Sequence, residues 1–234
     1  MKVVDCPSPN SDERPDGRAP DMLVLHYTGM PTAKEALDRL CDASAKVSAH
    51  YMIEEYGTLY RLVPEERRAW HAGVSSWEGE TDINGRSIGI ELVNPGHEFG
   101  YRAFPEAQMA ALEALAGDIV ARRAIVPLHV VGHSDVAPLR KQDPGELFDW
   151  QRLAKKGIGL WPPRARRTSF PHWTLADVQA ALQGIGYGIE TTGILDDQTR
   201  AVITAFQRHF LPKNLTGMAD AVTIGRLLDF AAVV

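Results

Sequence analysis

Apolar residues in the first part of this chain fall into short runs separated by polar turns. Three such runs occupy residues 22–26, 87–93 and 128–133. Runs of this length, bounded by turn residues, predict buried strands. Two more runs, 51–53 and 58–63, flank a polar turn and predict a β-hairpin.

Other segments have helical spacing. Thr32 begins a helix with Glu35 three residues on, the pattern of a capping box. Residues 7–20 are rich in Pro, Asp, Ser and Arg and predict an extended loop. Strands that alternate with helices predict an α/β fold over residues 1–163, a mixed central sheet flanked by helices. The clearest helix follows Pro105, with an apolar stripe formed by Met109, Leu112, Leu115, Ala116 and Ile119.

The tail has a different pattern, which repeats. Residues 192–199 recur as 216–223, with a Thr-Gly pair, an aspartate and a threonine at matching places. Asp196 and Asp220 have the position and chemistry of helix N-caps. The repeat therefore predicts a small C-terminal module of three helices over residues 170–234.

The composition narrows the class of protein. A hydrophobic fraction of 44% and a charged fraction of 24% are those of a soluble globular chain. The net charge of −5 gives no broad basic character, so we expect no nucleic-acid partner. No apolar stretch approaches the roughly 20 residues that cross a bilayer, so no transmembrane segment is predicted.

The N-terminus and the cysteines bear on location. The first residues lack the apolar core of a secretory signal. Cys6 and Cys41 do not make a disulfide framework in a chain of this length, and we expect two free, packed thiols. Both features favour the cytoplasm, with the periplasm as the alternative if a leader had been removed.

Three residues that are far apart in the chain have the chemistry of a metal site. His26 and His133 each end an apolar run, and Asp143 lies in a polar turn before Pro144. Two imidazoles and a carboxylate suit Zn²⁺ that keeps one position open for water, which points to hydrolysis. Taken singly, each residue has an ordinary explanation, as a hydrogen-bonded histidine at a strand end or a turn aspartate.

The surrounding segments resemble one family. They match, in order, the zinc-dependent N-acetylmuramoyl-L-alanine amidases of bacterial cell-wall recycling and lysis, related to the phage T7 lysozyme and peptidoglycan-recognition fold. The tail resembles the small peptidoglycan-binding helical module, through features that include Gly186-Tyr187, Thr192-Gly193 and Gly217. The segments that carry the amidase resemblance are 25–28, 48–53, 69–73, 87–92, 131–135 and 140–145.

The resemblance implies roles for five residues. His26, His133 and Asp143 would bind zinc. Glu91 would act as general base and acid, although strand alternation alone favours a surface glutamate. Lys141 would stabilise the oxyanion, with an ordinary solvated lysine as the alternative.

We also expect a groove that binds substrate. Aromatic rings suit sugars and peptide stems, although Tyr51 and Trp70 could equally pack in the core. The expected groove residues are His50, Tyr51, Trp70, His71, Arg86 and Asn94.

The predicted activity is hydrolysis of the amide between the lactyl group of (anhydro-)N-acetylmuramic acid and L-Ala of the peptidoglycan stem peptide. The predicted partners are peptidoglycan or muropeptide fragments. The alternative is a non-catalytic peptidoglycan-binding protein on the same fold. A zinc peptidase is a third possibility, which the lack of a His-Glu-x-x-His motif disfavours.

Overall fold

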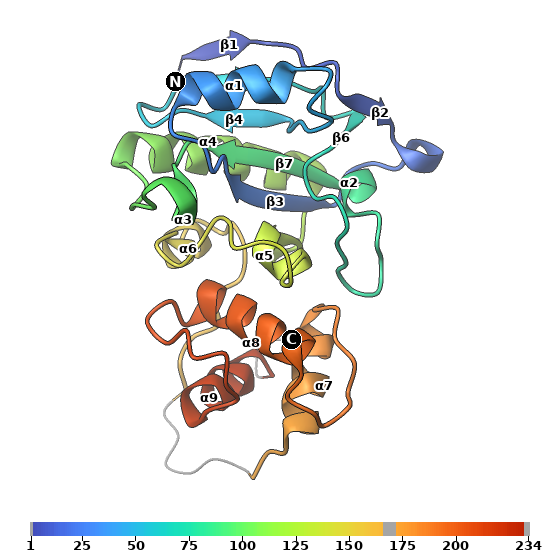
Figure 1. The fold of residues 1–234 in the computed structure, drawn as a ribbon, viewed down its shortest axis with the longest axis vertical. Helices are drawn as coiled ribbons and strands as arrows, with labels where there is room; N and C mark the ends of the chain where they lie inside the picture. Colours follow the sequence, from blue (N-terminus) through green and yellow to red (C-terminus); the bar gives the residue numbers. More distant parts are fainter. Residues whose placement is uncertain (1, 166–171, 232–234) are drawn as a thin grey trace.

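The computed structural model describes residues 2–165 and 172–231. Its centre is a six-stranded sheet with the order β1-β5-β4-β7-β3-β8 (Figure 1). Strands β4 and β5 form the predicted antiparallel hairpin, and the other neighbours pair in parallel, so the prediction of a mixed sheet is confirmed. The strands are β1 (Val3–Asp5), β3 (Met22–Tyr27), β4 (Tyr51–Ile53), β5 (Leu59–Arg61), β7 (Ser87–Leu92) and β8 (Val130–Gly132).

Each face of the sheet is covered by a helix. Helix α4 (Glu106–Arg123) buries its predicted stripe against one face, and α1 (Ala33–Cys41) covers the other face beside β4. In β3, Leu23 and Leu25 point toward α4, whereas Met22 and Val24 point to the opposite side. This two-residue alternation places His26 on the side away from α4.

The sequence predictions were wrong in two places. The segment 7–20 is not wholly a loop, because β2 (Ser11–Glu13) pairs antiparallel with β6 (Arg67–Ala69). The predicted strand at 128–133 is shorter, since Pro127 begins a 3₁₀ turn, η2 (Pro127–His129), and His133 already begins α5 (His133–Val136). Proline fixes φ and lacks an N–H, which suits the start of a turn better than a strand. The other short elements are η1 (Pro15–Gly17), α2 (Ile83–Arg86), α3 (Gly96–Phe99) and α6 (Trp150–Ala154).

The tail forms three helices, α7 (Leu175–Ile185), α8 (Asp197–Phe210) and α9 (Ala221–Phe230). Asp196 accepts from the backbone of Thr199, and Asp220 does the same for the next helix, as predicted for N-caps. The sequence repeat has a structural cause. Gln179 Oε1 accepts from Gly193 N at 2.7 Å, and Gln207 Oε1 accepts from Gly217 N at 2.8 Å. Each unit therefore ties a helix to the glycine turn that follows it.

These helices pack directly on the rest of the chain, with α8 beside α5 (Figure 1). One apolar core runs from β3 and β8 into the three helices. At its polar edge, Asp135 accepts from Tyr187 Oη at 2.7 Å and pairs with His209 Nδ1 at 2.8 Å. The His209 ring also stacks on Trp150 at 3.7 Å between centroids. The tail is thus fixed to α5, the helix that begins with His133.

Two further expectations concern the thiols and the membrane. Cys6 and Cys41 are free, as predicted, with their Sγ atoms 3.5 Å apart. Within residues 2–165 and 172–231, none of the helices is both long and apolar enough to cross a membrane. The joint between the predicted units 1–163 and 170–234 lies partly in residues 166–171, outside the described residues.

Candidate metal centre

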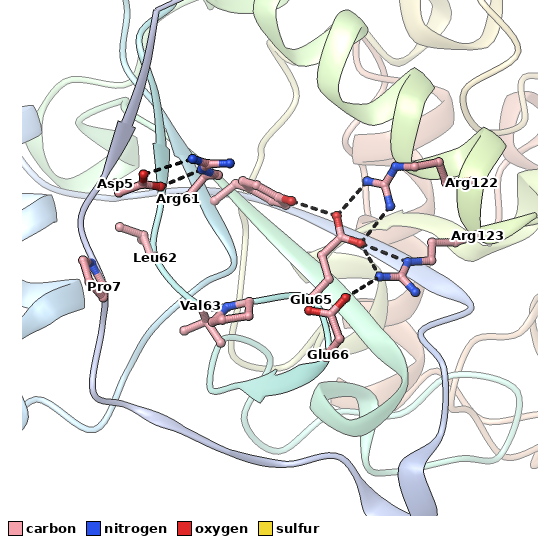
Figure 2. A pocket seen from close by; sticks show the side chains of 11 residues that line it. Asp5, Pro7, Arg61, Leu62, Val63, Glu65, Glu66, Arg122 and Arg123 are labelled. Carbon is pink, nitrogen blue, oxygen red and sulfur yellow. Dashed lines mark hydrogen bonds and ion pairs between the residues drawn. The ribbon is translucent and has the colours of Figure 1, made fainter.

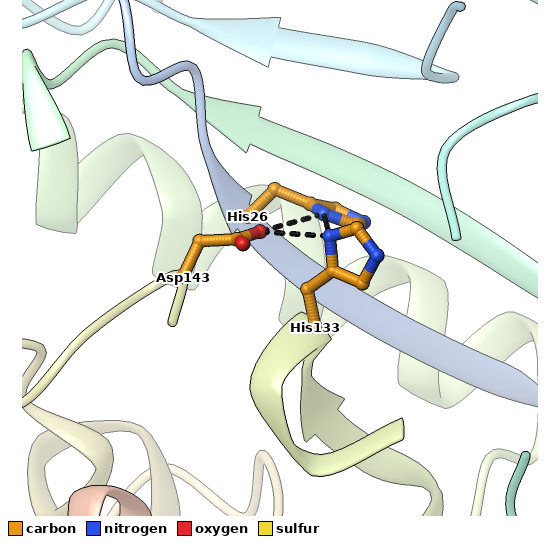
Figure 3. Close-up of side chains that lie close together, drawn as sticks. All are labelled: His26, His133 and Asp143. Carbon is orange, nitrogen blue, oxygen red and sulfur yellow. Dashed lines mark hydrogen bonds and ion pairs between the residues drawn. The ribbon is translucent and has the colours of Figure 1, made fainter. Parts of the chain in front are cut away.

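His26, His133 and Asp143 meet at one edge of the sheet (Figure 3). His26 Nδ1 lies 2.9 Å from His133 Nδ1, and Asp143 Oδ2 lies 3.0 Å from each of these nitrogens. The sheet explains the meeting, because β3 and β8 are parallel neighbours and their carboxyl ends coincide. All three side chains are buried.

Hydrogen bonds on the far side of each ring fix which nitrogen carries the proton. His133 Nε2 lies 3.0 Å from Ala72 O, a carbonyl that can only accept, so Nε2 is the protonated nitrogen. Ser87 Oγ donates to a backbone carbonyl and therefore accepts from His71 Nε2 at 3.1 Å. His71 Nδ1 must then accept from His26 Nε2 at 3.0 Å. Both Nδ1 atoms are left with a lone pair.

Charge at the site agrees with this assignment. Burial, and then the nearby charge of His133, lower the pKa of His26 to about 4. Burial raises the pKa of Asp143, but the interaction with His133 and His26 when these rings carry a proton outweighs it and lowers the pKa of that carboxyl far below its usual value. Two lone pairs and a carboxylate thus face one point without a proton between them. A divalent cation satisfies this arrangement, and the N₂O donor set is one that zinc accepts.

Glu91 stands beside the metal group. It is in register with His26 on the neighbouring strand β7 and is nine-tenths buried. Its Oε2 atom has no hydrogen-bond partner in the part of the chain that the structure describes. Burial, reinforced by the charge of Asp143, raises the pKa of Glu91 well above its usual value. A buried carboxyl with a raised pKa beside a metal site is typical of a catalytic acid or base.

A hollow of about 510 Å³ opens above these residues. His71, Glu91, His133, Lys141 and Asp143 all line it, so the structure brings together most of the predicted centre. Sequence reasoning missed several other residues on its wall. Three of them adjoin predicted residues in sequence, whereas Arg39 and Glu98 come from α1 and α3 and gave no sequence signal. The missed polar residues are Tyr27, Thr28, Arg39, Glu98, Arg140 and Gln142.

Of the six predicted groove residues, only His71 lies on this hollow. His50 is fully buried and supports the sheet, since its Nδ1 accepts from Gly89 N at 2.9 Å and its Nε2 lies 3.1 Å from Arg67 O. A Cβ on Gly89 would lie 2.5 Å from the His71 ring, so glycine is required there for the ring to pack.

The structure places the other four elsewhere. Tyr51 lines a separate hollow, shown in Figure 2, where its hydroxyl donates to Glu65 at 2.7 Å. Trp70 donates to Asp12 at 2.7 Å. Arg86 is buried against Asp21, and Asn94 donates to the carbonyl of Arg102. Their contact with substrate stays a prediction.

Comparison with known proteins identifies the family. Residues 16–146 match the family described as N-acetylmuramoyl-L-alanine amidase, and residues 174–227 match the putative peptidoglycan binding domain. The chain belongs to the N-acetylmuramoyl-L-alanine amidase family. This amidase is 42% identical over 222 residues to N-acetylmuramoyl-L-alanine amidase AmiD of Escherichia coli (strain K12), covering 86% of this chain and 79% of AmiD.

Other relatives extend the comparison. The 1,6-anhydro-N-acetylmuramyl-L-alanine amidase AmpD of Citrobacter freundii is 36% identical over 63% of this chain and 86% of AmpD. A solved structure of E. coli AmiD with anhydro-N-acetylmuramic acid-L-Ala-D-γ-Glu-L-Lys has a TM-score of 0.82 at 38% identity, covering 92% and 90% of the two chains. A structure of AmpDh3 of Pseudomonas aeruginosa with anhydromuramic pentapeptide also has a TM-score of 0.82, at 34% identity and 92% coverage of both chains. The amidase fold and its C-terminal helices are thus shared as one unit.

Proposed function

We propose that this amidase uses zinc to hydrolyse the amide between the lactyl group of (anhydro-)N-acetylmuramic acid and L-Ala of the stem peptide. The arrangement of His26, His133 and Asp143 carries the proposal, because hydrogen bonds leave a lone pair on each histidine Nδ1 and the lowered pKa of Asp143 keeps the adjacent carboxyl ionised. The substrate in the solved complex of AmiD, a muramyl tripeptide, supports the choice of bond.

The chain's own residues divide the chemistry. Bound zinc supplies a Lewis acid and lowers the pKa of a water molecule. Glu91 takes a proton from the attacking water and delivers one to the departing amine, since its carboxyl is buried and its Oε2 atom has no hydrogen-bond partner among the described residues. Lys141 lines the same hollow, and its positive charge stabilises the negative charge that develops on the carbonyl oxygen.

We also propose two functional units, an amidase domain over residues 1–163 and a peptidoglycan-binding domain over 170–234. The match of residues 174–227 to a peptidoglycan binding domain supports the second unit. Tyr187 and Phe206, buried in the core of this unit, serve its packing rather than its surface.

The test is incubation with anhydro-muramyl-L-Ala-γ-D-Glu-L-Lys and detection of the free tripeptide with a new L-Ala amino terminus. A chelator should abolish release, and added zinc should restore it. Binding of the ligand without release of the peptide would instead support the non-catalytic alternative. Release of shorter peptides would indicate a peptidase.

The sequence-based expectation of a cytoplasmic location stays a prediction. Cell fractionation tests it directly. A comparison of rates on soluble anhydro-muropeptides and on intact sacculi decides between the two predicted partners, muropeptide fragments and peptidoglycan.

A further inference from the structure

A second, smaller hollow adjoins the metal hollow. It has a volume of about 250 Å³ and lies between the loop after α5 and one face of α8. Lys141 and Gln142 line both hollows, so the two are continuous along this loop. The remaining lining residues are Pro138, Asp197, Arg200, Ala201, Thr204 and Arg208.

This α8 hollow carries an excess of positive charge. Lys141, Arg200 and Arg208 line it, against one carboxylate, that of Asp197. Arg208 is already engaged, with its Nε 3.4 Å from Glu146. Lys141 and Arg200 have no carboxylate within ion-pair distance among residues 2–165 and 172–231, and the guanidinium of Arg200 contacts only the Met218 sulfur, at 3.3 Å.

The cations that line the hollow in Figure 2 are paired differently from those of the α8 hollow. In the hollow of Figure 2, the cations are paired within the protein, Arg61 with Asp5, and Arg122 and Arg123 with Glu65 and with one further carboxylate each, Asp118 and Glu66. Cations that line one depression without such partners repel each other and attract an anion. The α8 hollow is therefore suited to an anionic ligand, and arginine is well shaped to bind a carboxylate with two hydrogen bonds.

The proposed reaction identifies the anion. In an anhydro-muramyl peptide the lactyl carboxyl is consumed in the scissile amide and the sugar is uncharged. The negative charges lie on the peptide, because a γ-linked glutamate keeps its α-carboxylate and the last residue keeps its terminal carboxylate. Resting on the function proposed above, we propose that the α8 hollow binds a carboxylate of the stem peptide, with Arg200 as its main donor.

This subsite gives the C-terminal helices a direct part in substrate binding. α8 is held in place by the contact of its His209 with Asp135 and by its packing on α5, so Arg200 has a fixed position relative to Lys141. Specificity for the stem would then depend on both units.

The experiment compares two substrates in the full-length protein. One is anhydro-muramyl-L-Ala-γ-D-Glu-L-Lys, and the other is the same molecule with both peptide carboxylates converted to carboxamides. For the unaltered protein we expect the KM of the diamide to be about fivefold to tenfold higher. Arg200→Gln should raise the KM of the acid substrate by a similar factor, leave kcat within twofold, and bring the ratio of the two KM values close to one.

Lys213→Gln is the matched control, since it removes an exposed cation from the same unit that does not line the hollow, and it should change neither KM. The inference is overturned if the unaltered protein has equal KM values for both substrates. It is also overturned if Arg200→Gln raises both KM values equally, which would indicate contact with an uncharged part of the glycan. If neither substrate is cleaved, the proposed function fails, and calorimetric binding of the same pair still decides the subsite.

Discussion

His26 and Glu91 lie in register on the adjacent parallel strands β3 and β7. Side chains in register on neighbouring strands point to the same face of a sheet, here the face away from α4. One pairing therefore sets a candidate metal ligand beside a candidate proton carrier. Substitution of His26 should affect the reaction differently from substitution of Glu91, and the difference separates their roles.

His26→Ala should remove the metal and the activity together. The variant leaves one imidazole and one carboxylate, so we expect zinc affinity to fall by more than about 100-fold, beyond the effect typical of residues behind the ligands. Metal analysis after dialysis and an amide-hydrolysis assay measure the two losses. His172→Ala, which removes an exposed histidine, is the control and should bind zinc normally. Full zinc occupancy in His26→Ala would exclude this residue as a ligand.

Glu91→Gln should keep the metal but slow turnover. The amide has nearly the same shape as the carboxyl and cannot exchange a proton, so kcat should fall by about 10²- to 10⁴-fold. Zinc content should stay at the level of the unaltered protein. Glu190→Gln changes an exposed glutamate in the C-terminal unit and serves as control. A kcat within twofold of normal would assign the proton transfer to another group.

His71→Ala should weaken zinc binding without removing a ligand. His71 accepts from His26 Nε2 and thereby keeps Nδ1 free for the metal. Loss of such a supporting group commonly costs about 10- to 100-fold in metal affinity. Competition with a chromophoric chelator measures it. His71→Gln keeps an acceptor in reach of His26 and should restore part of the affinity, a result that simple loss of packing does not predict.

The metal-free protein should lose stability as the pH falls below about 6.5. Burial lowers the pKa of His50 to about 3 and that of His26 to about 4, from the usual histidine value of 6.5. Between the lowered pKa values of the folded chain and pH 6.5, the unfolded chain binds protons that the folded chain does not, so acid favours unfolding. The stabilisation is complete above pH 6.5 and disappears toward the folded pKa values.

Urea unfolding of chelator-treated protein between pH 6.5 and pH 5 tests this. Well below pH 6.5, each histidine should lower the free energy of unfolding by up to about 1.4 kcal/mol per pH unit. Glu91 acts against one histidine in this window, because its raised pKa lets the folded chain hold a proton that the unfolded chain releases. Carboxylates with ordinary pKa values contribute little. A free energy independent of pH would show that these rings are not kept neutral by burial.

The contact between Asp135 and the C-terminal helices should be important for stability. His209→Ala removes a hydrogen bond to a buried carboxylate and a ring stacked on Trp150, so we expect a loss of at least about 2 kcal/mol. Tyr187→Phe removes only the other hydrogen bond and should cost about 1.5–3 kcal/mol. Chemical denaturation measures both, with His172→Ala as control. Unchanged unfolding of His209→Ala would show that the tail is only loosely attached.

The sequence by itself determined the local structure and the three candidate metal ligands. Apolar runs predicted the strands, the stripe after Pro105 predicted α4, and Asp196 was predicted as an N-cap. Each of these features depends on side chains that are close together in the chain. His26, His133 and Asp143 were recognised through residues immediately beside them. Family resemblance supplied Glu91, for which alternation alone favoured the surface.

The tertiary structure decided which side chains share a cavity. Arg39 and Glu98 reach the metal hollow from α1 and α3, and Tyr51 points into a different hollow, since these placements depend on how elements cross the sheet. His209 looked like an ordinary helical residue until α8 was set against Asp135. Arg200 is likewise just an exposed cation in the sequence. Its role follows from the packing of α8 beside the loop of Lys141, a long-range contact that no local pattern encodes.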